Sequence, residues 1–489
     1  MKKHLAPVVF TLLLLGPIVG IAQEKGYHIK LKIKGFKDTT VYLGHYLVSP
    51  ENFYIQDTTR LNKEGEGEFL GDKPLNQGQY AITLKDKALF ELVVPKDQVF
   101  SIETDTLNYD KYTKVTGSDE NELFFMFRKM NQEKQEEYKA LLPKGGAKPD
   151  AATQQKLMAF AKEVTEQRQQ FLQKNEKYLF ARIIKSAQEP IIPEAFRQKL
   201  TGKPDSANQV FLYYRSHYFD NIDFSEELSF RMSFIKSKIK YFLNNLTVQR
   251  DDSIAKAADY IVTLSKNNPA TKKLLLWQLI SKAETPDSPV APDGLFQYLA
   301  KKYYVGEPSL WDTSTIRRIA ERAKATEGII MGKKIPQMHL TDTLGRAFWL
   351  HNIQAKFLFV VIYDPNCSHC RELIPKIVKI QDQIKANNGA VLLVSGPRED
   401  KPWRQFIREF KTQKLINGID LHIDPQTKKL EGHTDFEKLF GINGYPLVLI
   451  VDKDKKIIAK SLPIDNYVNF LQFMNKQDAK AAPAAKSAK

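Results

Sequence analysis

The pattern of apolar and polar residues changes along the chain and divides it into segments of different predicted structure. Residues 23–117 begin with a strict alternation over 28–34, in which Ile29, Leu31 and Ile33 share one face. Alternation with period two is typical of a half-buried β-strand. Further short apolar runs, separated by glycines and prolines, follow at 41–43, 80–84, 90–94 and 99–102. We therefore expect a small all-β sandwich or barrel of antiparallel strands, without a catalytic constellation.

Residues 118–328 have the periodicity of helices. Ser118 can cap a first helix, because acidic residues follow it and are favourable near a positive helix end. After a Pro-Gly break at 143–146, we expect a second helix from about Ala151 to Ser186, and then further helices punctuated by prolines. Many aromatic residues lie between 211 and 242, where helical spacing favours a packed core over a ligand-lined groove. This segment is predicted to be a mainly α-helical domain.

Residues 329–475 show a third pattern, in which strands and helices alternate. The continuous apolar run Phe357–Tyr363 is typical of a strand buried on both faces of a parallel sheet. A helix pattern follows, then a strand at 390–394, a helix around 403–411 and a strand at 447–451. This order predicts an α/β domain. The Ala/Lys-rich tail, residues 476–489, is expected to be disordered.

Residues 1–22 have the features of a secretory signal peptide: a basic start, a short apolar stretch and small residues before a cut after Ala22. An anchoring membrane helix is less favoured, because Gly16 and Pro17 interrupt the apolar stretch. No cysteine lies near the cut, so we do not expect a lipoprotein. The predicted location is the periplasm or cell envelope, which is an oxidising compartment.

Composition narrows the class of protein. A chain of 489 residues with 42% hydrophobic and 27% charged residues is typical of a folded protein of about three domains. The net charge of +16 comes from lysines scattered through every segment, which favours a solvated surface over a nucleic-acid site. The only cysteines, Cys367 and Cys370, exclude a disulfide-stapled scaffold and a four-cysteine zinc site.

These two cysteines carry the candidate chemistry, in the sequence Cys367-Ser368-His369-Cys370 directly after the apolar strand and at the start of a helix. One helical turn brings both sulfurs within bonding reach. Cys367 lies where the helix dipole favours an anion, so we expect a lowered thiol pKa there, with protonated His369 adding a second positive charge. Cys370 is expected to be more buried and less acidic. Cys367 would then attack a disulfide, and Cys370 would resolve the mixed disulfide.

Three alternatives compete with a redox dithiol. A structural disulfide across so short a loop would constrain the unfolded chain little and stabilise poorly. A zinc site would need His369, His422 or His433 to converge with the cysteines, and no spacing in the sequence indicates it. Covalent haem attachment needs a histidine immediately after the second cysteine, where this chain has Arg371.

The last 145 or so residues resemble the TlpA/ResA-like branch of the thioredoxin superfamily, the bacterial envelope thiol–disulfide oxidoreductases. The resemblance rests on the strand Phe357–Tyr363, the segment Tyr363–Cys370, Pro375, and Gly444-Tyr445-Pro446 before the last strand. It implies a C-terminal thioredoxin-like fold, with Pro446 as a cis-proline beside the dithiol and the backbone of Tyr445 pairing with the substrate chain. The two preceding segments are similar to accessory domains of such proteins.

The chain also departs from this pattern at the positions that handle protons. Val361 replaces the buried carboxylate of thioredoxins, and Leu373 replaces the glutamate of ResA-like proteins, with Glu372 one position earlier. Asp364 is another candidate for proton transfer, although an Asp-Pro pair at a strand end more often forms only a turn. A peroxiredoxin is not favoured, because its upstream Pro and Thr or Ser are replaced by Val360 and Asp364.

The sequence therefore predicts an exported thiol–disulfide oxidoreductase, a reductase or an isomerase, that acts on protein disulfides. Its only redox group would be the Cys367–Cys370 disulfide, without a metal or other cofactor. Its partners would be envelope protein thiols and disulfides and a membrane-bound or soluble electron donor, with no nucleic acid. A histidine before the second cysteine resembles the motifs of DsbA and protein disulfide isomerase, which implies a potential above about −270 mV. The alternative is an envelope binding or scaffold protein whose accessory domains recognise a partner and whose dithiol is secondary.

Overall fold

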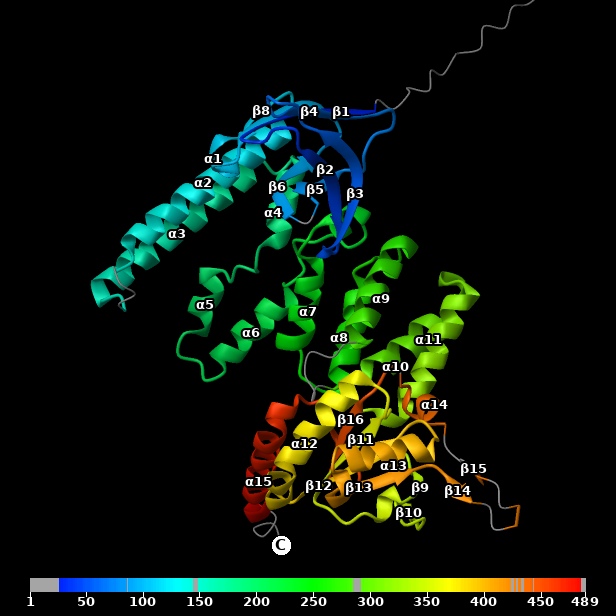
Figure 1. The fold of residues 1–489 in the computed structure, drawn as a ribbon. Helices are drawn as coiled ribbons and strands as arrows, with labels where there is room; N and C mark the ends of the chain where they lie inside the picture. Colours follow the sequence, from blue (N-terminus) through cyan, green and yellow to red (C-terminus); the bar gives the residue numbers. More distant parts are fainter. Residues whose placement is uncertain are drawn as a thin grey trace, which may run out of the picture. The chain divides into compact units, whose positions relative to one another are not determined.

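The computed structural model shown in Figure 1 consists of two compact units. It describes residues 26–85, 87–143, 148–284, 292–423, 426–427, 430–431, 435–442 and 444–484, so the predicted signal peptide lies outside the described residues. The first unit comprises the described residues up to Ile191 together with Phe219–Ile222 and Leu228–Ile235, and the second comprises the rest. The segment 118–328, expected as one helical domain, is therefore shared between the two units.

The first unit contains two four-stranded β-sheets. One has the strand order β4-β1-β7-β8 and the other the order β3-β2-β5-β6. Their strands are β1 (Tyr27–Lys34), β2 (Thr40–Leu47), β3 (Ser49–Arg60), β4 (Glu66–Gly71), β5 (Gly78–Leu84), β6 (Lys87–Val94), β7 (Val99–Asp105) and β8 (Lys114–Thr116). Ile29, Leu31 and Ile33, which were expected to share one buried face, are each at most 2% exposed. The sheets are not wholly antiparallel, because β1 pairs with β7 in parallel.

Helix α2 (Asp119–Leu141) belongs to this unit because it is bonded to the sheet. The Ser118 hydroxyl accepts from the Asn121 N–H at its N-terminus, as expected of a cap. The Asn121 side chain accepts from the backbone N–H of Val93 at 2.8 Å and donates to its carbonyl at 2.7 Å, which fixes α2 on β6. A short helix, α1 (Tyr109–Tyr112), precedes it.

The single helix expected from Ala151 to Ser186 is two helices, α3 (Ala151–Lys174) and α4 (Leu179–Ala187). The carboxylate of Glu120 in α2 accepts from the backbone N–H groups of Leu179 and Phe180, at 2.7 and 3.0 Å. These two N–H groups open α4, and the N-cap residue Tyr178 forms no side-chain capping bond with them. A carboxylate from another helix takes that place. Sequence periodicity carries no sign of this long-range cap.

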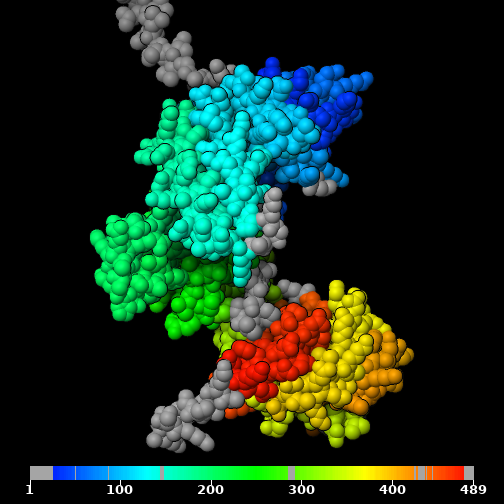
Figure 2. Space-filling view, turned by 90° about the vertical axis from the view of Figure 1, so that its left-hand side faces the viewer, coloured from blue at the N-terminus to red at the C-terminus, as the bar shows by residue number. Residues whose placement is uncertain are grey.

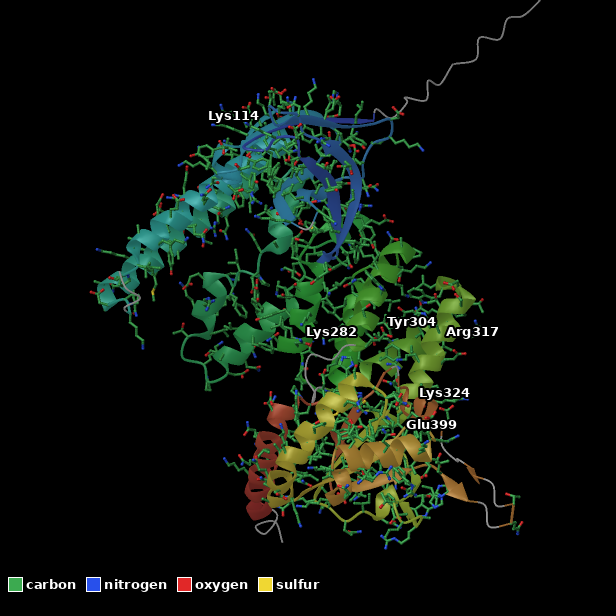
Figure 3. The ribbon with its side chains drawn as sticks, viewed as in Figure 1. Lys114, Lys282, Tyr304, Arg317, Lys324 and Glu399 are labelled. Atoms are coloured by element: carbon green, nitrogen blue, oxygen red, sulfur yellow. The ribbon has the colours of Figure 1, made fainter. Side chains whose placement is uncertain are left out.

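The helices of the second unit that precede its sheet are α5 (Glu194–Leu200), α6 (Ser206–Ser216), α7 (Ile235–Asn245), α8 (Asp251–Thr263), α9 (Pro269–Glu284), α10 (Leu295–Leu299) and α11 (Thr313–Thr326). A π-helical turn, η3 (Ala300–Val305), packs on α11; Figure 3 shows Tyr304 on this turn and Arg317 and Lys324 on α11. Arg322 of α11 donates to the carbonyl of Gly441 at 2.6 Å. This bond and the packing of α11 on α14 join the helices to the C-terminal α/β region.

The aromatic-rich stretch between 211 and 242 is largely core. Tyr218, Phe219, Phe224, Phe230 and Phe242 are buried, as the helical spacing favours. Phe211 and Tyr241, in contrast, are more than 40% exposed, so the stretch is not buried throughout.

The second unit holds a seven-stranded sheet in the order β10-β9-β13-β12-β11-β16-β17. Its strands are β9 (His339–Thr341), β10 (Ala347–Trp349), β11 (Phe357–Tyr363), β12 (Gly389–Ser395), β13 (Ile416–Ile419), β16 (Leu447–Val451) and β17 (Ile457–Lys460). Strands β11, β12 and β13 are parallel, whereas β16 runs antiparallel to β11. Every residue of β11 is buried, as its continuous apolar run predicts. A separate two-stranded pair, β14 (His422–Ile423) and β15 (Leu430–Glu431), follows β13.

Alternate residues of β11 supply two different cores. Phe357, Phe359, Val361 and Tyr363 pack with α12 (Ser368–Ala386), α13 (Asp400–Glu409) and α15 (Tyr467–Ala484). Leu358, Val360 and Ile362 face the opposite side and pack with α14 (Phe436–Phe440) and the segment around Met338. Figure 2 shows α15 in red beside α12 in yellow. The tail expected to be disordered from Lys476 is helical in α15 as far as Ala484, and residues 485–489 lie outside the described part.

Within the described part of the chain, no helix has the length and apolar character needed to cross a lipid bilayer.

Candidate active site

Cys367 lies between the carboxyl end of strand β11 and the first turn of helix α12. Its backbone N–H donates to the carbonyl of Asp364 at 3.1 Å, and its own carbonyl accepts from the N–H of Arg371 at 3.1 Å. Cys367 is thus the N-cap of α12, but its side chain forms no capping hydrogen bond with the helix. The sulfur is half-buried and stays available to another group, next to N–H groups that have no partner within the helix.

Cys370 lies one turn into α12 and is fully buried. Its side chain belongs to the core formed by the α12 face of β11, together with Tyr363 and Trp403. Burial, together with the neighbouring Cys367 sulfur, raises the pKa of the Cys370 thiol to about 12. Both cysteines are free thiols in this structure, one accessible and the other inside. The sequence predicted the same division between them.

The loop before β16 comes close to the accessible cysteine. The peptide bond between Tyr445 and Pro446 is cis, as the resemblance implied. The Cys367 thiol donates to the carbonyl oxygen of Tyr445, with 3.4 Å between sulfur and oxygen. Leu447, which follows the proline, pairs with Ile362 near the end of β11, so sheet pairing holds the loop at this edge. The three predicted residues Cys367, Tyr445 and Pro446 are therefore brought together.

Arg371 fixes the turn that carries the dithiol. Its guanidinium donates to the carbonyl of Pro365 at 3.2 Å and forms an ion pair with Glu409 at the end of α13. The guanidinium also lies over the ring of Phe410, 4.8 Å from its centroid. Arg371 thus joins the loop before Cys367 to helix α13. The sequence indicated Arg371 only as a residue that excludes haem attachment.

Of the candidates for proton handling, only Asp364 lies close to the dithiol: its carboxylate is near enough to add to the effect of burial in raising the pKa of the Cys370 thiol. The Asp364 carboxylate accepts from the backbone N–H of Asn366 at 2.8 Å, which is the turn geometry typical of an Asp-Pro pair. His369 and Glu372 are exposed on α12, and neither has a hydrogen bond or ion pair among the residues that the structure describes. Asp364 therefore shapes the loop, while His369 and Glu372 face solvent.

Tyr363 is a residue of the site that the sequence analysis did not single out. It is fully buried at the end of β11, and its hydroxyl has no hydrogen-bond partner among the described residues. Burial, and secondarily the nearby Cys370 thiol, raise the pKa of the Tyr363 phenol. The alternation of β11 could have identified it, because residues 357, 359, 361 and 363 share the α12 face.

The histidines considered for a zinc site have other surroundings. His422 contacts the Thr341 hydroxyl at 2.9 Å, lies 3.5 Å from the buried Asp420 carboxylate and stacks on His339. His433 lies outside the described residues. Within the described part, no three His, Cys, Asp or Glu side chains are grouped so that they could hold a metal ion.

Comparison with known proteins finds similarity only among solved structures, since no protein-family model and no curated protein matches the chain. A thioredoxin-like protein from Bacteroides caccae matches 58% of this chain and 98% of its own, at 18% identity and a TM-score of 0.46. A domain of a possible thiol-disulfide isomerase from Cytophaga hutchinsonii matches 31% of this chain and 97% of its own, at 30% identity and a TM-score of 0.28. A thiol:disulfide interchange protein from Bacteroides sp. matches 29% of this chain and 88% of its own, at 24% identity and a TM-score of 0.25. These three structures carry the names of a thioredoxin-like protein or of thiol–disulfide proteins, and each matches only part of this chain.

Proposed function

We propose that this protein is an exported thiol–disulfide oxidoreductase that reduces or isomerises protein disulfides in the cell envelope. One observation carries the proposal: the accessible Cys367 sulfur lies 3.4 Å from the Tyr445 carbonyl, and the buried Cys370 lies one helical turn behind it. This arrangement presents one sulfur to an incoming chain and withholds the other, which is the division of labour that disulfide exchange needs.

In the first step, the Cys367 thiolate attacks one sulfur of a substrate disulfide. The sulfur–sulfur bond of the substrate breaks, a new bond joins Cys367 to the attacked sulfur, and the other substrate sulfur leaves as a thiolate that takes up a proton. Because the Tyr445 carbonyl faces the Cys367 sulfur, the attached substrate chain would lie along the loop that contains Pro446.

In the second step, Cys370 loses its proton and attacks the Cys367 sulfur. The mixed disulfide breaks, the Cys367–Cys370 disulfide forms, and the second substrate sulfur leaves and is protonated. The substrate has gained two electrons and two protons. The protein has lost two electrons and the two protons of its thiols, of which the Cys367 proton left before the first step. The raised pKa of the Cys370 thiol keeps this sulfur protonated in the reduced protein, which disfavours its competing with Cys367 for the substrate disulfide.

The dithiol could also isomerise disulfides, if a different thiolate of the substrate attacks the mixed disulfide before Cys370 does. The bond between Cys367 and the substrate then breaks, Cys367 leaves as a thiolate, and the substrate keeps a disulfide with a new pairing. Exposed His369 would add positive charge beside the dithiol when protonated, and this would favour the reduced form and raise the potential. A glutathione redox titration tests this: we expect a value above about −270 mV for the wild type. We also expect His369→Ala to lower it. A value at or below about −270 mV, or an unchanged potential in the variant, would contradict the role of His369.

The decisive experiment for the activity is reduction of insulin, and refolding of a scrambled disulfide substrate, by the full chain with dithiothreitol as the electron source. We expect Cys367→Ser to abolish both activities, and Cys370→Ala to accumulate mixed disulfides that Cys367→Ser never forms. Wild-type rates in Cys367→Ser would instead favour the alternative, an envelope binding or scaffold protein with a secondary dithiol. Mixed disulfides trapped by Cys370→Ala in intact cells would then identify the natural substrates.

A further inference from the structure

The first unit contains a pocket of about 810 Å³, remote in sequence from the dithiol. Residues of α2, α3 and α4 line it, together with Glu91 of β6 and Asp110 of α1. Its volume falls in the range of about 300–1,000 Å³ that is typical of ligand sites in proteins. Neither the dithiol chemistry nor the comparisons assign a role to this pocket.

One part of the pocket wall is apolar. Phe124, Phe127, Val164 and Ile183 contribute to it, and each is less than 8% exposed. Phe160, on the α3 side, adds a partly buried ring. An apolar wall with aromatic rings favours a ligand that has an apolar or aromatic group.

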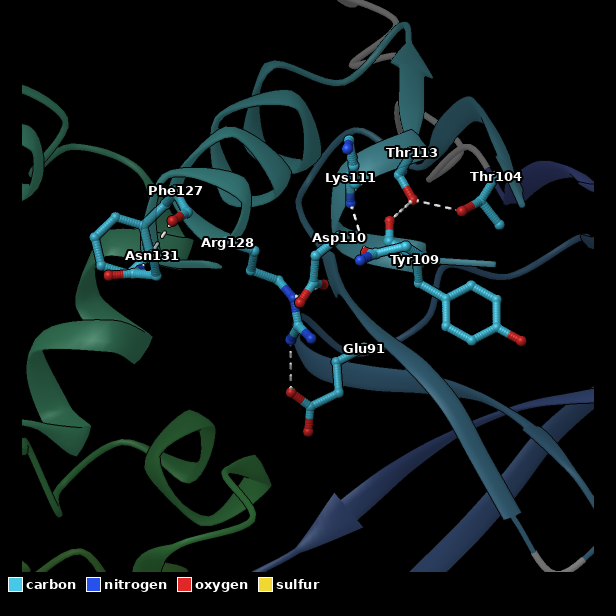
Figure 4. A network of polar contacts seen from close by, with 10 residues as sticks. Glu91, Thr104, Tyr109, Asp110, Lys111, Thr113, Phe127, Arg128 and Asn131 are labelled. Carbon is cyan, nitrogen blue, oxygen red and sulfur yellow. Dashed lines mark hydrogen bonds and ion pairs between the residues drawn. The ribbon is translucent and has the colours of Figure 1, made fainter. Parts of the chain in front are cut away.

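At one end of the pocket, two carboxylates surround one guanidinium. Arg128 donates to Asp110 at 2.6 Å and to Glu91 at 3.4 Å, as Figure 4 shows. Two carboxylates around one guanidinium leave an excess of negative charge, so this end would repel an anionic ligand.

About one helical turn further along α2, the pocket wall carries a positive charge, that of Arg168. The Asn131 side chain donates to the Phe127 carbonyl at 2.9 Å, which orients its amide so that the oxygen accepts from Nε of Arg168. Within the described part of the chain, the two terminal nitrogens of Arg168 have no hydrogen-bond or ion-pair partner. A guanidinium held by its Nε, with both terminal nitrogens available, is well suited to bind a carboxylate through two hydrogen bonds.

The same face of α2 also offers an acceptor. The side-chain oxygen Oε1 of Gln132 is buried and has no hydrogen-bond partner among the described residues, while its amide nitrogen donates to Glu136 at 3.3 Å. Leaving a buried acceptor unpaired is unfavourable. Because solvent does not reach this oxygen, a ligand N–H would pair with it only after the Gln132 side chain turns towards the pocket.

We propose that this pocket binds the C-terminal carboxylate of a peptide whose last residue is apolar or aromatic. The carboxylate would pair with Arg168, a backbone N–H of the peptide would donate to Gln132 Oε1, and the last side chain would lie on the wall formed by Phe124 and Phe127. The acid-rich end at Arg128 determines in which direction the peptide lies, because Asp110 and Glu91 would repel its carboxylate there. This inference stands independently of the proposed redox activity.

Isothermal titration calorimetry with the full chain tests the proposal, using acetyl-Gly-Gly-Phe and the same tripeptide with an amidated C-terminus. We expect one saturable site for the free acid and affinity at least tenfold weaker for the amide. Arg168→Gln should weaken binding of the free acid at least tenfold, and Gln132→Met should weaken it at least threefold. Lys156→Gln is the matched control. It removes one positive charge from an exposed position of α3, the helix that also carries Arg168, and should leave the affinity unchanged.

The acid–amide comparison needs only the wild-type protein, so a folding defect in a variant cannot obscure the result. Equal affinity for acid and amide, or the absence of binding, would overturn the proposal. An equal loss of affinity in Lys156→Gln and Arg168→Gln would overturn the assignment of the carboxylate to Arg168. N-acetylphenylalanine that binds as tightly as the tripeptide would overturn the peptide as ligand and indicate a free organic carboxylate.

Discussion

The Cys367 sulfur and the Tyr445 carbonyl oxygen lie 3.4 Å apart although 78 residues separate them in the chain. Two neighbouring strands cause this proximity: β11 ends just before Cys367, β16 begins just after Tyr445, and the two pair antiparallel. The sheet thus places the exposed thiol against a backbone group that a substrate chain can also reach.

The two cysteines should differ strongly in their reaction with iodoacetamide in the native, reduced protein. Cys370 is fully buried and its thiol pKa is raised to about 12, so little of it is both accessible and ionised at neutral pH. We expect alkylation of Cys367 alone, with Cys370 labelled only after denaturation. Mass spectrometry of peptides from both conditions measures this, and equal labelling in the native state would contradict the assigned burial.

Removing Arg371 should loosen the loop that carries the dithiol. Arg371→Met loses the bond to the Pro365 carbonyl, the ion pair with Glu409 and the contact with the Phe410 ring. These groups are partly exposed, so we expect unfolding in urea to show a loss of about 1–2 kcal/mol, with a several-fold lower rate of insulin reduction. The control is Arg408→Met, at an exposed position of α13, which should change neither quantity.

Asp364→Asn separates the two roles considered for this residue. An asparagine can still accept from the N–H of Asn366 and keep the turn, but it cannot carry a proton as a carboxylate does. Because the structure uses Asp364 in the turn, we expect the rate of insulin reduction and its pH profile to stay within about twofold of the wild type. A lost or shifted limb of the pH profile would mean that the carboxylate transfers a proton after all.

Two buried tyrosines should be more stable as phenylalanines. The hydroxyls of Tyr363 and Tyr467 are buried and have no hydrogen-bond partner within the described residues. Since an unpaired buried hydroxyl costs about 1–3 kcal/mol, we expect Tyr363→Phe and Tyr467→Phe each to raise the free energy of unfolding by about 1 kcal/mol. The matched control is Tyr80→Phe, because this buried hydroxyl donates to the Asn76 carbonyl at 2.9 Å and its loss should be destabilising. Destabilisation by all three substitutions would show that a partner, such as a buried water, satisfies the first two hydroxyls.

The reduced protein should lose stability in alkali because of Cys370. Its thiol pKa is about 12 in the folded protein, against 9.0 for an unperturbed thiol, so the folded state binds the proton more tightly than the unfolded state does. This contribution to stability is complete below about pH 9 and is lost as the pH rises towards about 12, by at most about 4 kcal/mol. Denaturant unfolding from pH 7 to 11 should show a steeper loss in the reduced wild type than in reduced Cys370→Ala, which keeps only the loss from other groups such as the buried Tyr363 phenol. Parallel curves for the two proteins would contradict the raised pKa.

The sequence by itself determined the strands and helices whose patterns are local and regular. The alternation of Ile29, Leu31 and Ile33, the cap at Ser118 and the fully buried run Phe357–Tyr363 each follow from the residues within one element. The dithiol followed in the same way, because its two cysteines lie one helical turn apart directly after that run. These features depend on the periodicity of side chains within one element and on the dipole at one helix end, and not on the remaining chain.

Only the tertiary structure decided the features that depend on contacts between distant segments. The break between α3 and α4 coincides with the carboxylate of Glu120 in another helix, and the division of the helical segment follows from which helices bond to which sheet. The pairing of Arg371 with Glu409 also depends on such contacts. The same holds for the Tyr363 hydroxyl and the Arg168 terminal nitrogens, which have no partner among the residues that the structure describes. Hydrogen-bond and ion-pair partners are chosen by proximity in space, and local sequence patterns carry little information about proximity between distant residues.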